Sequence, residues 1–150
     1  MDKDRELAGK VDALLGKHGF PASRLELDIP ENATLAGDEN TNAVLSELRH
    51  LGVRIAVDDF GAGSASLTYL RILPLDVVKI DQVLIAGLDK TPADRALVLG
   101  MIGTAHGLGL SVVAKGVETT EQRDFLRVAG CDIAQGFLLG RPVPLDDLGL

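Results

Sequence analysis

The chain has 150 residues and a formal charge of −7, which allows one domain with a real core and argues against a basic surface for nucleic acid or an anionic membrane. Its apolar runs are too short to cross a bilayer, and its single cysteine, Cys131, cannot form an internal disulfide. The charged start, Met1 to Glu6, is unlike a signal peptide. We therefore expect one cytoplasmic domain without membrane insertion and without a nucleic-acid polymer as partner.

Helical and extended patterns alternate along the chain. Capping residues open two of the helices, because Thr91 stands before Pro92 and Thr119 stands three residues before Gln122. The strands are short β-branched or alternating runs bounded by glycine and proline. The predicted order is helix 4–18, strand 25–29, helix 38–50, strand 53–57, helix 64–72, strand 75–81, helix 92–107, strand 111–114, helix 119–130 and strand 131–136.

No hairpin turn separates these strands, so the alternation predicts βαβ crossovers and an α/β fold built on a parallel sheet of about five strands. In such a sheet the carboxyl ends of all strands lie on one side, where ligands bind. Charged and polar residues gather at these ends. They are Asp28, Glu31, Asp58, Asp59, Lys79, Asp81, Lys115, Glu118 and Gln135.

Two interpretations of these residues stand side by side. Carboxylates from different strands could hold Mg²⁺ or Mn²⁺ and activate water for phosphoryl chemistry. Alternatively, Lys79 and Lys115 could neutralise the acids in a salt-bridged interior, because buried charges are costly unless they are paired. Composition and spacing alone do not favour one of them.

Five segments carry a family resemblance: Leu27–Glu31, Asp58–Leu67, Val78–Asp81, Val112–Thr119 and Gly130–Phe137. In this order and spacing they resemble the EAL domain, the cyclic di-GMP phosphodiesterase module of bacterial signalling. The match covers residues 25–144 and follows a leading helix within residues 1–20, so residues 1–150 form a single EAL-like domain. The resemblance implies a TIM-like (β/α)₈ barrel and Mg²⁺- or Mn²⁺-dependent hydrolysis of cyclic di-GMP to pGpG.

The resemblance also assigns roles to single residues. The metal ligands would be Asp28, Asp58 and Asp59, and Asp28 stands where the family has Glu. The catalytic set would be Lys79, Glu118 and Gln135. Substrate and loop contacts would come from Glu31, Phe60, Gly61, Gly63 and Ser66, around a mobile loop from Gly61 to Leu67 that couples substrate, metal and the dimer interface.

Departures from the family pattern change the expected function. Lys115 replaces an active-site Glu, and its positive charge would repel ions held by Asp58 and Asp59. Asp28 is one methylene shorter than Glu, and the segments with the Glu-Ala-Leu motif and a metal-binding Asn are absent from this chain. We therefore predict a partial, degenerate EAL-like barrel lacking the first strands, with weak or absent metal binding and no catalysis on its own.

Five strands cannot close an eight-stranded barrel, and an unpaired edge is a template for another chain. We expect self-association, a partner fragment or the first helix to cover the gap. The predicted role is sensing, with cyclic di-GMP as candidate ligand, or protein interaction. The alternative is a Mg²⁺- or Mn²⁺-dependent cyclic di-GMP phosphodiesterase completed by another chain, and a third role is a scaffold.

Overall fold

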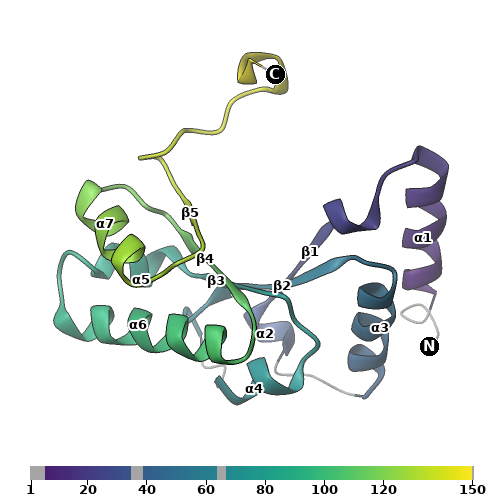
Figure 1. Ribbon diagram of the computed structural model, residues 1–150, viewed down its shortest axis with the longest axis horizontal. Helices are drawn as coiled ribbons and strands as arrows, with labels where there is room; N and C mark the ends of the chain where they lie inside the picture. Colours follow the sequence, from purple (N-terminus) through teal and green to yellow (C-terminus); the bar gives the residue numbers. More distant parts are fainter. Residues whose placement is uncertain (1–5, 35–38, 64–66, 150) are drawn as a thin grey trace.

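The computed structural model describes residues 6–34, 39–63 and 67–149. Five parallel strands form one sheet in the order β1-β2-β3-β4-β5, so each strand pairs with its neighbour in sequence (Figure 1). The strands are β1 (Glu26–Pro30), β2 (Arg54–Phe60), β3 (Val77–Ile80), β4 (Ser111–Lys115) and β5 (Ile133–Gln135). The predicted α/β class and the partial barrel sheet are confirmed.

Helical segments precede, connect and follow the strands. They are α1 (Leu7–His18), α2 (Glu31–Thr34), α3 (Glu39–His50), α4 (Leu67–Ile72), α5 (Gln82–Gly87), α6 (Pro92–Gly107) and α7 (Thr120–Val128), with 3₁₀ turns η1 (Ala22–Arg24) and η2 (Leu145–Leu148). Thr91 and Thr119 cap α6 and α7 as predicted, and Thr119 forms a capping box with Gln122. None of the helices described is long and apolar enough to cross a membrane.

Short helix α5 was not predicted. It follows β3 directly because Asp81, which the sequence placed at the end of that strand, lies beyond it and acts as the N-cap of the helix. The Asp81 Oδ1 atom accepts a hydrogen bond of 2.7 Å from the Val83 N–H. The carboxylate of Asp81 therefore serves the backbone of α5.

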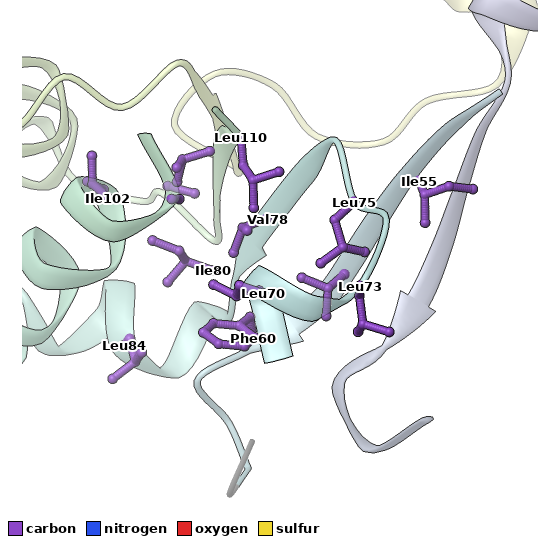
Figure 2. Packing of buried hydrophobic residues seen from close by; sticks show 14 of the residues in the cluster. Ile55, Phe60, Leu70, Leu73, Leu75, Val78, Ile80, Leu84, Ile102 and Leu110 are labelled. Atoms are coloured by element: carbon purple, nitrogen blue, oxygen red, sulfur yellow. The ribbon is translucent and has the colours of Figure 1, made fainter. Parts of the chain in front are cut away.

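The main core lies between one face of the sheet and the helices. Every second residue of the strands points into it, as in Ile55, Val57 and Ile80, each fully buried. Figure 2 shows side chains from β2, β3, α4, α5 and α6 meeting in this core. Phe60, predicted as a substrate or loop contact, is only 2% exposed and packs here, so its side chain is part of the core.

The opposite face of the sheet carries the polar residues. Only a small apolar cluster of Ala56, Val77 and Val113 is buried on it among the described residues. Registers Glu26 with Arg54 and Lys115 with Gln135 place these side chains on the same face, because paired residues of parallel strands share a face. Beyond β5 the chain runs away from the sheet toward η2 (Figure 1).

Candidate functional site

The site begins with an irregularity in β2. Val57 pairs with Val78 and Phe60 pairs with Ile80, so β2 has one residue more than β3 between these pairs. The extra residue makes a bulge at Asp58 and Asp59, and Asp59 has a left-handed φ of 52°. In a regular strand neighbouring side chains point to opposite faces. The bulge instead lets both carboxylates reach the same cation.

That cation is the ammonium group of Lys115, the last residue of β4. Its Nζ atom lies 2.8 Å from Asp58 Oδ1 and 2.7 Å from Asp59 Oδ1. Burial lowers the pKa of Lys115, but the two carboxylates outweigh this effect and raise the pKa above its ordinary value. Burial also acts against the Asp58 carboxylate, yet hydrogen bonds from Lys115 and from the Asp59 N–H keep the pKa of Asp58 below its ordinary value.

Lys79 on β3 forms a second centre of the same kind. Its Nζ atom lies 2.9 Å from Glu26 Oε1 and 2.8 Å from the carboxylate of Asp28, and its side chain is 15% exposed. Burial lowers the pKa of Lys79, and the two carboxylates outweigh this and raise it. Glu26 was not predicted as a site residue, although it lies two residues before Asp28 in β1 and therefore on the same face of the strand.

The three predicted metal ligands, Asp28, Asp58 and Asp59, are therefore brought together with Lys79 and Lys115 as ion pairs. Each ammonium contacts two carboxylates from other strands, which is the salt-bridged arrangement that the sequence left as one of two interpretations. A divalent ion such as Mg²⁺ needs about six oxygen ligands. Here Oδ1 of Asp58 and Oδ1 of Asp59 each contact Lys115, and within the described ranges no three His, Cys, Asp or Glu groups converge to hold a metal. The residues as arranged do not fit the metal that the family resemblance implies.

Glu31 anchors the loop that follows the bulge. Its side chain accepts hydrogen bonds from the Gly61 N–H at 3.3 Å and from the Gly63 N–H at 2.7 Å. The residue is 6% exposed. A Cβ at position 63 would lie 2.6 Å from Glu31 Oε2, so a side chain there would displace the Glu31 carboxylate from this hydrogen bond. Ser66, the remaining predicted loop residue, lies outside the described residues.

A hollow of about 170 Å³ lies beside Lys115 at the ends of β4 and β5. Glu118 and Gln135, both predicted for the catalytic set, are exposed residues of its wall. Gln82 was missed by sequence reasoning, because it belongs to the unpredicted helix α5. The lining consists of Gln82, Lys115, Gly116, Glu118, Gln135, Gly136 and Phe137.

The chain matches the family model described as EAL domain over residues 2–142. It is 42% identical over 139 residues to the cyclic di-GMP phosphodiesterase NbdA of Pseudomonas aeruginosa, covering 93% of this chain and 18% of that protein. The chain spans about a fifth of the length of the curated relatives it matches.

Solved structures agree with this match. The PaMucR phosphodiesterase in complex with c-di-GMP has a TM-score of 0.88 and 38% identity, covering 95% of this chain and 58% of that one. A manganese and cy-diGMP complex of Klebsiella pneumoniae BlrP1 has a TM-score of 0.83 and 31% identity, covering 89% of this chain and 34% of that one. The NbdA match covers 93% of this chain and the PaMucR match covers 95%, and the chain belongs to the EAL domain family.

Proposed function

We propose that this chain is an EAL module that does not hydrolyse cyclic di-GMP and instead senses the dinucleotide without a metal. One observation carries the proposal: the Lys115 ammonium contacts Asp58 and Asp59 at 2.8 and 2.7 Å. Metal-assisted hydrolysis needs a divalent ion that lowers the pKa of bound water. An ammonium group holds the same two carboxylates but offers no coordination position to a water molecule.

Charge supports the absence of metal. Four carboxylates, from Glu26, Asp28, Asp58 and Asp59, face the two lysines that they contact. Arg54 adds a third positive group, 3.9 Å from Glu26. These seven residues thus carry four negative and three positive charges, and little net negative charge remains among them to attract a divalent ion.

The groups next to Lys115 support recognition of a nucleotide through hydrogen bonds. An ammonium group has three N–H donors, and two of those of Lys115 are directed at Asp58 and Asp59. The adjoining hollow has amide and carboxylate groups from Gln82, Glu118 and Gln135. A phosphate oxygen seated there would receive the third N–H, while the polar wall would bind groups of the nucleotide.

We also propose that the module works in the cytoplasm, where cyclic di-GMP signalling takes place.

Calorimetry and product analysis together test this function. Cyclic di-GMP is titrated into the purified chain with Mg²⁺, with Mn²⁺ and with EDTA, and each mixture is then analysed for pGpG by chromatography. We expect the same affinity in all three buffers and no pGpG. Metal-dependent binding followed by pGpG release would contradict the proposal and support a phosphodiesterase. Absence of binding would also contradict it and would leave protein interaction as the role.

A further inference from the structure

We infer that the fold brings Asp58 and Asp59 so close together that they need a cation between them. Lys115 always supplies this cation, so the conformation of residues 58–63 does not depend on divalent ions. The inference rests on the proposed function in one respect, namely that the site works without a metal. It concerns a different property, the conformation of residues 58–63.

The close approach of Asp58 and Asp59 originates in the core. Val57 and Phe60 are 0% and 2% exposed and pack in the same cluster. Side chains three residues apart point to opposite faces in a regular strand, so one extra residue must be inserted to bury both. The register shift between Val57 and Phe60 is that insertion. Burial of these two apolar residues thus fixes the bulge.

The bulge brings two like charges together. Asp58 and Asp59 both have a carboxylate oxygen within 2.8 Å of the same nitrogen atom, so without that nitrogen two negative groups would face each other at close range. Regularising the strand would relieve this repulsion, but it would remove Phe60 from the core. A cation between the two carboxylates neutralises this repulsion and leaves Phe60 in the core.

The neutralised bulge is continuous with the loop. The Asp59 N–H donates to Asp58 Oδ1 at 2.9 Å, and the Ala62 N–H donates to the Asp59 carbonyl at 3.3 Å. The Gly61 and Gly63 N–H groups both donate to Glu31. One unbroken series of contacts thus runs from Lys115 at the end of β4 to Glu31 at the start of α2. Loss of the ammonium group should loosen all of these amides.

Hydrogen exchange measured by mass spectrometry tests the inference. The variant is Lys115→Met, which keeps the chain length and removes the charge, and the matched control is Lys90→Met at an exposed lysine outside the site. We expect amides of residues 58–63 to exchange about tenfold faster in Lys115→Met, as loss of about 1.4 kcal/mol from charge-assisted hydrogen bonds would produce. Mn²⁺ should slow them again in this variant and have no effect on the wild type or on Lys90→Met.

Two further measurements keep the test decisive. The amides of α7 serve as an internal reference, because a change confined to residues 58–63 is local and a change in both is global unfolding. The double variant Lys115→Met/Asp59→Asn removes the like-charge pair, and it should regain wild-type exchange without Mn²⁺. Wild-type exchange in Lys115→Met, or slower exchange of the wild type upon addition of Mn²⁺, would overturn the inference.

The two proposals fail in different ways. Release of pGpG by the wild type would contradict the proposed function without changing the exchange of Lys115→Met. Unchanged exchange in Lys115→Met would contradict the inference that Asp58 and Asp59 need a cation between them, even if the wild type releases no pGpG. The assays therefore identify which statement is wrong.

Discussion

Reversing the charge of Lys115 should convert the ion-paired centre into one that attracts divalent ions. Two unit charges 4 Å apart interact by about 4 kcal/mol at an effective dielectric constant of about 20, so a lysine and a divalent ion at that distance repel by about 8 kcal/mol. The Lys115 side chain is 26% exposed, and water screens part of this repulsion. Even one third of it, about 2.7 kcal/mol, corresponds to about a hundredfold in Kd. We predict that Lys115→Glu binds Mn²⁺ at least about a hundredfold more tightly than the wild type.

Titration calorimetry with MnCl₂ measures the effect directly. Lys90→Glu is the matched control, because it changes the net charge of the protein by the same two units at an exposed position outside the site. Hydrolysis of cyclic di-GMP should stay incomplete in Lys115→Glu, since Asp28 still contacts Lys79. Equal Mn²⁺ affinity of Lys115→Glu and Lys90→Glu would refute the electrostatic reasoning, as would tight stoichiometric binding of Mn²⁺ by the wild type.

Three other predictions concern stability, each measured by urea unfolding. Glu31→Gln should lower the free energy of unfolding by about 1 to 3 kcal/mol, because its amide group would turn a donor toward the N–H of Gly61 or Gly63. The control Glu47→Gln, at an exposed position, should be nearly neutral, and equal effects of the two variants would contradict the anchoring role of Glu31. Gly136→Ala should lower the free energy of unfolding by about 1 to 3 kcal/mol or more, since its Cβ would overlap the Val117 backbone. Gly103→Ala in α6 has open space around its Cβ and should raise the free energy of unfolding by up to about 1 kcal/mol. A neutral effect of Gly136→Ala would show that Gly136 does not closely approach the Val117 backbone. Because the pKa of Asp58 is lower in the folded state, its carboxylate stabilises the fold at pH values above 3.8, and this contribution is lost as the pH falls through the folded-state pKa. Because the pKa of Lys115 is higher in the folded state, its ammonium group contributes fully to stability below pH 10.5, and this contribution is lost at higher pH. The stability difference between wild type and Lys115→Met should therefore be constant from about pH 5 to 9 and shrink as the pH falls below 3.8; a difference that does not shrink on acidification would contradict the ion pair as its source.

The sheet could be predicted because its signals are local. Short apolar runs, glycine ends and the caps at Thr91 and Thr119 each depend on residues close in sequence, and the parallel order followed from the absence of hairpin turns. The same order predicted that Lys79, Lys115 and the acidic residues would meet on one side of the sheet. This part of the site needed no knowledge of packing.

The pairing within the site could not be predicted, because it depends on register. The sequence Asp58-Asp59 gives no sign that both side chains reach one cation, and regular alternation would separate them. The bulge results from the burial of both Val57 and Phe60, which only the packed core reveals. Phe60 was assigned to the substrate and loop contacts from the family resemblance, and its burial likewise depends on the packed core. Glu26 was overlooked because its partner Lys79 is two strands away.

The central claim is that the Lys115 ammonium occupies the position of a divalent ion between Asp58 and Asp59. Anomalous diffraction at the manganese edge, from crystals of the wild-type chain soaked in MnCl₂ and cyclic di-GMP, tests it most directly. The account predicts no anomalous peak within coordination distance of these two carboxylates and clear density for the Lys115 side chain between them. A well-occupied manganese peak at that point, with Lys115 displaced, would contradict it.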